Sequence, residues 1–445
     1  MSERKEGVVA KHQDSDTCWQ QFSTDVFELS QRLIERDEHK WALCFQDSYY
    51  CAVAFMALAH AGKHLILPSN YQPAALEELS SLFDATLHDG LLDNLFNKPA
   101  YKLPLEHCVT GNQCRNKAFS SLVLQDIQLT LFTSGTSDTP KPIEKNLQHL
   151  SCEVDQLEAL WGPLLGNTII CSTVSHQHIY GLLFRVLWPL CSGRAFERLN
   201  LVYPEQVLIN AQDNRTLISS PALLKRVDNA EGTGQYRALF SSGGPLPEEA
   251  AKSSLQRLGV LPIEVFGSTE TGGIAYRQQQ AECNLWTLFP CVSARLNPDG
   301  CLTIKSPFIF EPQWYDTSDY CQLMPNNQFV LKGRADRVIK IEEKRLSLTE
   351  VEKRLSQLQF ADESAVVPII VENRTILCAV ITLTPYGDDR IALIGKGKFW
   401  IELRKYLREW LEPVGIPRKF RVVNEIPTNS QGKRIQRDLV SLFES

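Results

Sequence analysis

One short stretch of this chain, FTSGTSDTPKPIEK at residues 132–145, gathers hydroxyl groups, a glycine and two lysines. Hydroxyls and lysine ammonium groups donate to phosphate oxygens, and a glycine lets the backbone approach a ligand closely. The groups suited to this are Thr133, Ser134, Gly135, Thr136 and Lys141. The stretch is therefore a candidate polyphosphate loop, although such a cluster between regular elements is also typical of a solvated turn. Neither a Walker A sequence nor a GxGxxG fingerprint is present.

A second stretch, VFGSTETGG at residues 265–273, could add to a nucleotide site. Phe266 could stack on a base, Thr269 could donate to a phosphate oxygen, and Glu270 could hold Mg²⁺, a hard cation that prefers oxygen ligands. The alternative is a turn at the end of a strand, with the Phe buried.

Three further stretches carry polar groups at bends. SSGGPLPEE holds Gly243 and Gly244 at the entry to a helix, which its prolines can start. WYDTSDY places Asp316 and Asp319 among aromatic residues, where a carboxylate can accept from ribose hydroxyls, although Asp in a turn more often bonds its own backbone. Lys433 follows a glycine in SQGKR; a single lysine is usually a solvated surface residue.

The surrounding pattern predicts an α/β domain and then a smaller α+β domain. From about residue 20 to 330, short apolar runs alternate with helical periodicity, which is typical of mainly parallel sheets. The expected strands are residues 41–45, 64–67, 129–132, 168–171, 216–218 and 263–266. The expected helices are residues 50–60, 147–161 and 247–258. Beyond a charged segment near residue 330, we expect helices at 348–358 and 399–411 and strands at 363–371 and 375–383.

Composition limits the function classes. The chain has 445 residues, enough for two or three domains at about 150 residues each, and its net charge of -6 argues against nucleic-acid binding as the main function. Its 13 scattered cysteines form no CxxC pair, which favours a reducing cytoplasm and no zinc site. The first 16 residues have no apolar core of a signal peptide, and the longest apolar run, residues 49–61, is too short to span a membrane.

Taken in order, these stretches resemble the motifs of the adenylate-forming enzymes, a family that includes acyl- and aryl-CoA synthetases. The resemblance runs from about residue 129 to 439. FTSGTSDTPK is similar to the family's phosphate loop, VSHQHIYGL to its acyl-pocket segment, and SSGGPLP to the segment that passes the adenine. VFGSTE is similar to YGxTE, WYDTSD to YxTGD, KGRADRVIKIEEKRL to the hinge motif, and PTNSQGKRIQR to the carboxy-terminal lysine motif. A weaker likeness is to the small ligases of aryl-polyene or polyketide-type lipid assembly.

The resemblance implies a fold and a reaction. The fold would be a large amino-terminal α/β domain, residues 1–334, and a small mobile carboxy-terminal α+β domain, residues 337–445, with a hinge at Asp336. The reaction would use ATP and Mg²⁺ to convert a carboxylic acid into an acyl adenylate. The acyl group, from an aryl or fatty acid, would then pass to the phosphopantetheine thiol of CoA or of an acyl carrier protein.

It also implies roles for single residues. Thr133, Ser134, Gly135, Thr136 and Lys141 would cradle the β- and γ-phosphates. Phe266 would lie on the adenine, and Gly243, Gly244 and Gly267 would border both the nucleotide and the acid. Thr269 would touch the α-phosphate and Glu270 would hold Mg²⁺. Asp319 with Arg334 would fix the ribose, and Lys433 would bridge the acid and the α-phosphate. His178, Tyr180, Gly181 and Ile274 would border the acid, without deciding between aromatic and fatty acids.

Some positions depart from the family pattern. Asp138 and Pro142 stand where glycines are usual in the phosphate loop, and a carboxylate facing ATP would be repelled. Ser318 and Glu343 also replace glycines, the latter in the loop that borders the thiol's entry. Two alternatives therefore stay open: adenylation without thioester formation, and a nucleotide-binding scaffold that has lost catalysis.

Overall fold

The computed structural model of the chain describes residues 7–12, 15–69, 73–90, 98–104, 119–133, 141–279, 285–310, 313–341, 344–371, 374–408, 411, 413–428 and 434–444. The chain divides into two units, Met1–Ser293 with Lys305–Tyr315 and Ala294–Ile304 with Asp316–Ser445. Each unit has buried hydrophobic clusters of its own. The hinge expected at Asp336 stays a prediction.

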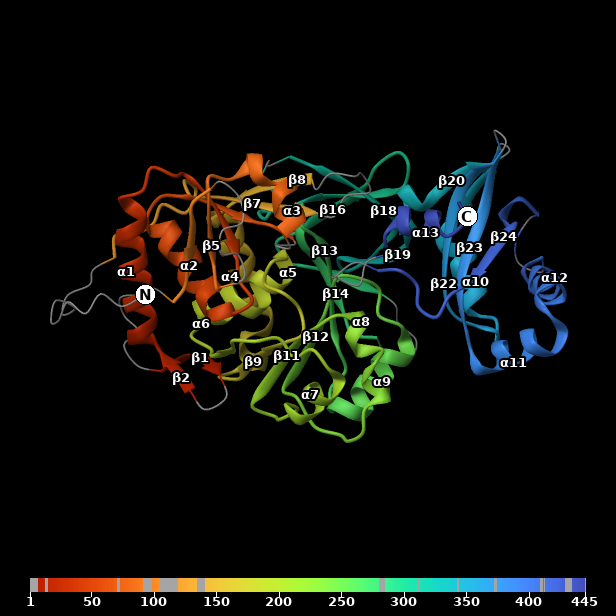
Figure 1. The fold of residues 1–445 in the computed structure, drawn as a ribbon, viewed down its shortest axis with the longest axis horizontal. Helices are drawn as coiled ribbons and strands as arrows, with labels where there is room; N and C mark the ends of the chain where they lie inside the picture. The colour runs from red at the N-terminus through yellow and green to blue at the C-terminus, as the bar shows by residue number, and fades with distance from the viewer. Residues whose placement is uncertain are drawn as a thin grey trace. The chain divides into compact units, whose positions relative to one another are not determined.

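A six-stranded sheet forms the first layer of the first unit (Figure 1). Its strand order is β6-β5-β3-β4-β7-β8, and all neighbours run parallel except β7 and β8. The strands are β3 (Lys40–Cys44), β4 (His64–Leu67), β5 (Ala85–His88), β6 (Ala100–Lys102), β7 (Gln128–Thr133) and β8 (Lys141–Asn146). Helix α2 (Ser48–His60) is buried along most of its length, as the apolar run at 49–61 predicted.

A second sheet contributes the other strands of this unit, in the order β15-β14-β13-β12-β11-β9-β10-β1-β2. From β1 to β13 along this order the neighbours run parallel, and β2, β14 and β15 are antiparallel additions. The strands are β1 (Val8–His12), β2 (Ser15–Cys18), β9 (Ile169–Ser172), β10 (Phe196–Glu197), β11 (Arg215–Ser219), β12 (Ala238–Ser241), β13 (Ile263–Ser268), β14 (Gly272–Arg277) and β15 (Trp286–Leu288). The predicted mainly parallel α/β architecture is confirmed.

Helix α4 (Leu147–Leu165) carries the apolar face that the sequence predicted. Its buried positions include Leu147, Leu150, Val154, Leu157 and Trp161. The Trp161 ring packs edge-on against Phe240 of β12, with centroids 5.0 Å apart, and against Tyr276 of β14 at 5.4 Å. Burial of one such side chain contributes about 1.5–3 kcal/mol, so this face fixes α4 against the second sheet.

The other helices of the first unit follow the strands. They are α1 (Trp19–Ile34), α3 (Pro73–Glu78), α5 (Ile179–Gly181), α6 (Trp188–Ser192), α7 (Pro204–Ile209), α8 (Pro221–Leu224) and α9 (Glu248–Leu258). A π-helical turn, η2 (Leu182–Leu187), joins α5 to α6. The predicted prolines do precede α9, since Pro247 is its N-cap.

The second unit has the predicted α+β composition, but it also includes residues 294–304 and 316–334, which the prediction placed in the large domain. Its strands are β16 (Ser293–Leu296), β17 (Cys301–Lys305), β18 (Tyr315–Met324), β19 (Gln328–Arg334), β20 (Val338–Ile341), β21 (Lys344–Ser347), β22 (Ala361–Val371), β23 (Arg374–Leu383) and β24 (Lys419–Val422). Its helices are α10 (Leu348–Ser356), α11 (Pro385–Ile394), α12 (Lys396–Leu407) and α13 (Gln436–Ser441). Side chains of α10, β23 and α12, among them Leu355, Leu377 and Leu403, share one core.

The stretch at residues 132–145 differs from the prediction, which treated all of it as a connection. Residues 141–146 form β8, antiparallel to β7, with Phe132 opposite Pro142. Because β8 is at the edge of its sheet, a proline that lacks the N–H donor is tolerated there. Pro142, which the prediction placed in the phosphate loop, therefore belongs to an edge strand, which is a correction.

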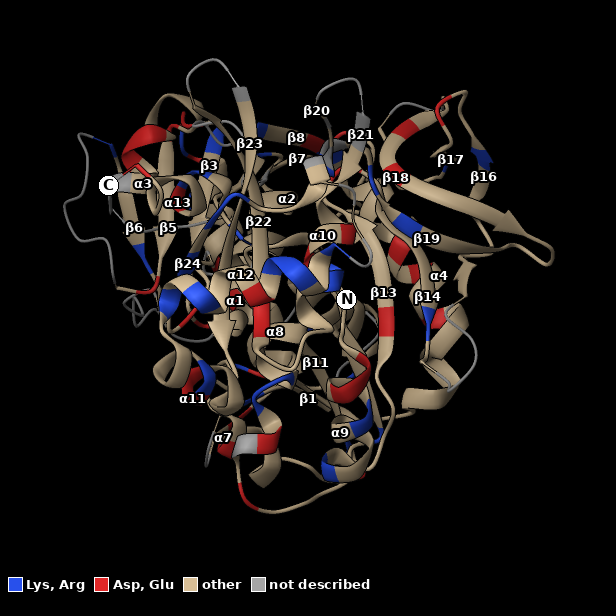
Figure 2. Cartoon of the chain, turned by 90° about the vertical axis from the view of Figure 1, so that its right-hand side faces the viewer, with Lys and Arg blue, Asp and Glu red and all other residues tan. Residues whose placement is uncertain are grey.

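Charged residues of both signs are interspersed along the ribbon in Figure 2. This agrees with a composition of 46 basic and 52 acidic residues. Within the described ranges, no helix combines the length and the hydropathy that a membrane crossing requires.

Candidate active site

The parallel strands of the second sheet end at a common edge, and predicted site residues follow them. Ser219 of β11 lies in register beside Ser241 of β12, and Ser241 lies beside Glu264 of β13. The carboxyl ends of parallel strands are where open α/β sheets bind ligands. The segments that hold Gly243 and Gly244, after β12, and the turn after β13 are thus brought together at this edge.

The turn between β13 and β14 carries Thr269 and Glu270 at its tip, both half-buried. Gly267 is required by close approach, because a Cβ there would lie 2.2 Å from the carbonyl oxygen of Gly272. The Thr271 hydroxyl is buried and donates to the Gly272 carbonyl over 2.8 Å. The turn is therefore tight and held from inside.

Two buried charged side chains hold this turn, and sequence reasoning missed both as site residues. The Lys145 ammonium donates to the backbone carbonyl of Glu270 over 3.1 Å and to that of Phe308 over 2.7 Å. Glu153 accepts from the Gly273 N–H at 2.7 Å. Burial lowers the pKa of Lys145 and raises the pKa of Glu153 to about 7. The sequence signal that could have indicated them is a charged residue among the apolar positions, Glu153 within α4 and Lys145 just before it.

The backbone at Gly243 and Gly244 is open. A Cβ added at either glycine would meet no atom of the described residues within 4 Å, and Gly243 has φ +93°, a conformation that favours glycine. Ser242 donates to the carbonyl of Val265 over 2.8 Å, which ties this segment to β13. The geometry leaves room for a flat group beside the glycines.

Phe266, the predicted adenine partner, is half-buried and has an aromatic neighbour. Its ring lies 5.4 Å from that of Trp286, at an interplanar angle of 50°. The Arg277 guanidinium lies over the Trp286 ring at 4.4 Å and pairs with the buried Glu264 at 2.8 Å. The ring of Phe266 is thus supported from β15.

The phosphate loop is described only at its two ends. Thr133, the last residue of β7, is paired in register with Lys141, the exposed first residue of β8. The pairing brings the ends of the loop together. The predicted residues that lie outside the described ranges are Ser134, Gly135, Thr136 and Lys433, together with Asp138 and Glu343.

The predicted acyl-pocket segment leads into the π-helical turn. His178 precedes α5, and Gly181 is packed so closely that a Cβ would lie 2.0 Å from the carbonyl oxygen of Ser175. Ile274 is buried in β14. Gly181 and Ile274 therefore have packing reasons for their identity, and their contact with an acid stays a prediction.

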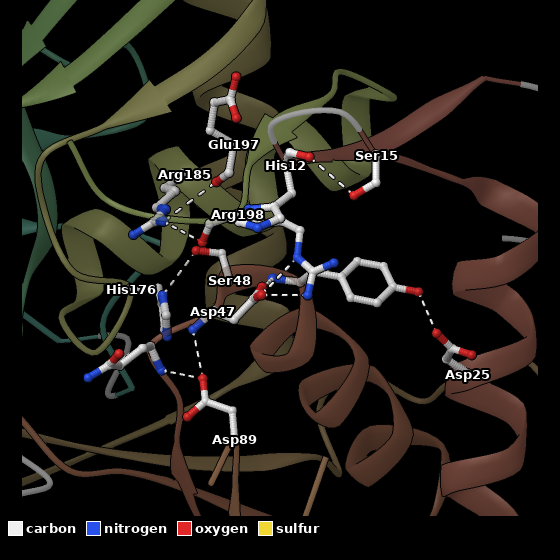
Figure 3. Close-up of polar contacts among 12 residues, drawn as sticks. His12, Ser15, Asp25, Asp47, Ser48, Asp89, His176, Arg185, Glu197 and Arg198 are labelled. Atoms are coloured by element: carbon white, nitrogen blue, oxygen red, sulfur yellow. Dashed lines mark hydrogen bonds and ion pairs between the residues drawn. The ribbon is translucent and has the colours of Figure 1, made fainter. Parts of the chain in front are cut away.

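The neighbours of His178 anchor this segment to the first sheet. His176 and Gln177 are buried and contact the carbonyls of Phe45, at 3.0 Å, and Leu43, at 3.1 Å. Since a carbonyl only accepts, Nε2 of His176 carries its proton, and Nδ1 accepts from the Ser48 hydroxyl at 3.2 Å (Figure 3). Sequence reasoning singled out His178 and missed this anchor.

A buried arginine holds the other side of the same segment (Figure 3). Arg185 of the π-helical turn donates to the carbonyl of Val174 over 3.2 Å and to that of Arg198 over 2.9 Å. Burial lowers the pKa of Arg185 to about 10. Arg198 in turn pairs with Asp47, the N-cap of α2, at 2.5 Å. The acyl-pocket segment is thus fixed by side chains that need not touch a ligand.

In the second unit, the structure pairs two predicted ribose residues. Asp319 and Arg334 lie opposite each other in β18 and β19, and their side chains approach to 3.5 Å. Asp319 is 6% exposed, whereas the Arg334 side chain is 49% exposed. Asp316, the other carboxylate of WYDTSDY, accepts from Thr303. Both aspartates lie in a strand, so the alternative of a local turn is wrong.

Asp336 lies in one turn of 3₁₀ helix, Ala335–Arg337, between β19 and β20. Its neighbour Arg337 pairs with Glu352 of α10 at 2.5 Å. The position links the strand that ends in Arg334 to the β20–β21 hairpin.

Among the described residues, no group of three or more His, Cys, Asp or Glu could hold a metal ion by itself. Magnesium in nucleotide enzymes is commonly held by one or two carboxylates with substrate phosphates. The half-buried Glu270 beside a phosphate-loop hairpin fits that chemistry.

Solved structures share this fold. ATP-bound MatB from Rhodopseudomonas palustris aligns with a TM-score of 0.83 at 16% identity, over 100% of this chain and 96% of that chain. O-succinylbenzoate coenzyme A synthetase (MenE) from Bacillus subtilis, in complex with AMP, aligns with a TM-score of 0.77 at 16% identity, over 98% of this chain and 96% of that chain. The fold is that of the adenylate-forming enzymes.

The family follows from the sequence match. The model of the AMP-binding enzymes matches residues 3–298, and the chain belongs to that family. A 4-coumarate–CoA ligase from Rhodobacter capsulatus is 30% identical over 217 residues, 48% of this chain and 53% of that protein. A D-alanine–D-alanyl carrier protein ligase from Staphylococcus haemolyticus is 24% identical over an alignment of 480 positions, gaps included, which covers 96% of this chain and 94% of that protein.

Proposed function

We propose that this protein activates a carboxylic acid with ATP and then passes the acyl group to a phosphopantetheine thiol. The observation that carries the proposal is the sheet edge where the open backbone of Gly243 and Gly244 adjoins the turn that presents Thr269 and Glu270. Membership of the AMP-binding family, with CoA ligases and a carrier-protein ligase among the relatives, supports it. The substrate is an aryl or fatty acid.

Phe266 would lie on the adenine, in the open space beside the two glycines. Asp319 would accept from the ribose hydroxyls with Arg334 beside it, and Thr269 would donate to the α-phosphate. The residues proposed to cradle the β- and γ-phosphates are Thr133, Ser134, Gly135, Thr136 and Lys141.

Glu270 would hold Mg²⁺, which would offset charge on the phosphates. In the reaction, an oxygen of the acid attacks the α-phosphorus and the bond to pyrophosphate breaks. Such transfers depend on positioning and electrostatics, so no covalent nucleophile of the protein is needed. The Lys433 ammonium would neutralise charge shared by the acid and the α-phosphate, worth about 3–4 kcal/mol in the transition state.

The thiol step would follow a rotation at Asp336 that removes Lys433 from the site and admits the thiol. The sulfur attacks the acyl carbon, and AMP leaves. The relatives include ligases for both kinds of acceptor, CoA and a carrier protein. We place the reaction in the cytoplasm, where ATP is available and buried thiols such as Cys44 and Cys51 stay reduced.

The test is to detect the intermediate and the thioester separately. The protein is incubated with ATP, Mg²⁺ and one acid at a time: benzoic, cinnamic, and short- to long-chain fatty acids. Mass spectrometry should detect an acyl-AMP with at least one acid, and later addition of CoA or a holo carrier protein should consume it. An acyl-AMP that neither acceptor consumes would contradict the second step.

A further inference from the structure

Two side chains hold the turn that carries Thr269 and Glu270, one from β8 at Glu270 and one from α4 at Gly273, which follows the turn. Lys145, the fifth residue of β8, donates to the Glu270 carbonyl at 3.1 Å. Glu153, two helical turns further along, accepts from the Gly273 N–H at 2.7 Å. Both side chains are buried, 1% and 3% exposed, so neither can touch a substrate.

The glycines of the turn leave space for this arrangement. A Cβ at Gly272 would lie 2.5 Å from Oε2 of Glu153, and one at Gly273 would lie 3.2 Å from its Oε1. Gly272 has φ +66°, which also favours glycine. Oε2 of Glu153 is buried and has no hydrogen-bond partner among the described residues, although a buried carboxylate is costly unless fully paired. The site thus keeps a charged group where packing alone would favour an apolar one.

Lys145 also links the turn to other parts of the first unit. Its ammonium donates to the Phe308 carbonyl at 2.7 Å, in the segment Lys305–Tyr315. It belongs to the strand that begins with Lys141 at the end of the phosphate loop. The consecutive elements β8 and α4 therefore carry the end of that loop, the Glu270 carbonyl contact and the Gly273 amide contact.

We propose that Lys145 and Glu153 are positioning residues that set the Thr269–Glu270 turn for the magnesium and α-phosphate contacts. This rests on the proposed adenylation. It adds that two buried side chains, without contact to any substrate, control through their backbone hydrogen bonds how well the protein holds magnesium-bound ATP. Their role is separable from stability, because a variant can be compared with another that removes a buried charge at the end of α4, and because Glu153→Gln removes the charge but keeps an acceptor for the Gly273 amide.

The test uses Lys145→Met, Glu153→Leu, the double variant and the conservative Glu153→Gln, which can still accept from the Gly273 amide. Equilibrium binding of ATP is titrated calorimetrically at rising Mg²⁺ without any acid, together with acid-dependent pyrophosphate exchange and the midpoint of urea unfolding. A matched control is Arg194→Met, which removes another buried charge that donates to backbone carbonyls at the end of α4, those of Gly162 and Gly166.

We expect Lys145→Met and Glu153→Leu to weaken magnesium-dependent ATP binding about tenfold, the scale of one lost charged hydrogen bond. Glu153→Gln should keep wild-type binding. The double variant should bind no more tightly than either single variant, and Arg194→Met should lose stability with unchanged binding. Wild-type binding in a folded Lys145→Met or in the double variant would overturn the proposal. Absence of exchange in the wild type would instead overturn the adenylation itself, and the binding data would still decide the positioning.

Discussion

Ser48, at the start of α2, donates a hydrogen bond to Nδ1 of His176 over 3.2 Å, and the two residues lie 128 positions apart. The other ring nitrogen, Nε2, faces the Phe45 carbonyl, so the neutral imidazole makes a hydrogen bond through each of its two nitrogens. Burial, with the nearby charge of Arg185, lowers the pKa of His176 to about 3. The contact that fixes the acyl-pocket segment is therefore sensitive to acid.

We expect stability to fall with acid through His176. The unfolded chain binds a proton near pH 6.5 while the folded chain does not until about pH 3, so the stability present above pH 6.5 is lost as the pH falls. One such group contributes a slope of about 1.4 kcal/mol per pH unit in that window. Urea unfolding of the wild type and His176→Gln at pH 7 and pH 5 measures it. The variant should lose about 2 kcal/mol less between the two pH values; equal losses would contradict the assignment.

The Asp319–Arg334 pair predicts a specific effect on ribose recognition. Asp319→Asn should raise the KM for ATP about tenfold, the scale of one charged hydrogen bond. Stability should change by less than about 1 kcal/mol, because the arginine is half exposed. Since the lost contact is to the ribose hydroxyls, the variant should no longer prefer ATP over 2′,3′-dideoxy-ATP. Retained preference would show that Asp319 does not contact the ribose.

Two glycines at the sheet edge should respond to alanine in opposite ways. At Gly244 a Cβ meets no described atom within 4 Å, so Gly244→Ala should leave the melting temperature nearly unchanged while its methyl group obstructs the adenine and raises the KM for ATP. At Gly272 the Cβ would strike Glu153 at a left-handed φ of +66°, so Gly272→Ala should lose about 1–3 kcal/mol of stability. Thermal unfolding and ATP titration of the two variants measure both effects, and an unaltered KM in Gly244→Ala would argue against adenine at this position.

Lys433 allows the two half-reactions to be separated. Lys433→Ala should slow formation of the acyl adenylate by about 10²–10³, because one positioned cation is lost from the transition state. Transfer from a chemically prepared acyl-AMP to the thiol should be largely kept. Single-turnover assays of each step measure this, and equal slowing of both steps would refute the proposed division of roles.

Most of the fold could be predicted from the sequence because many of the strands are short apolar runs, a pattern that is local in the sequence. Strand β8 could not, since Lys-Pro-Ile-Glu-Lys-Asn has low β propensity and is held in place by pairing with β7. The turn with Thr269 and Glu270 was recognised by its motif. Lys145 was not, because its partner Glu270 lies 125 positions away and no local pattern records that contact.

The acyl-pocket segment shows the same limit. The motif pointed to His178 as the residue beside the acid. In the structure, His176 and Gln177 make the contacts that anchor the segment. Side chains that bond distant backbone carbonyls leave no spacing in the sequence to detect. The residues that position the candidate site were therefore missed more often than those expected to touch a ligand.

Carboxylate-dependent exchange of labelled pyrophosphate into ATP tests the central claim most directly, because it requires reversible formation of an acyl adenylate and no acceptor thiol. With Mg²⁺ and a panel of aryl and fatty acids, the wild type should show exchange that depends on the acid. The same protein with Glu270→Ala, which removes the proposed magnesium ligand, should show little. If folded protein that binds ATP shows no exchange with any acid of a broad panel, that result would contradict adenylation and favour a nucleotide-binding scaffold.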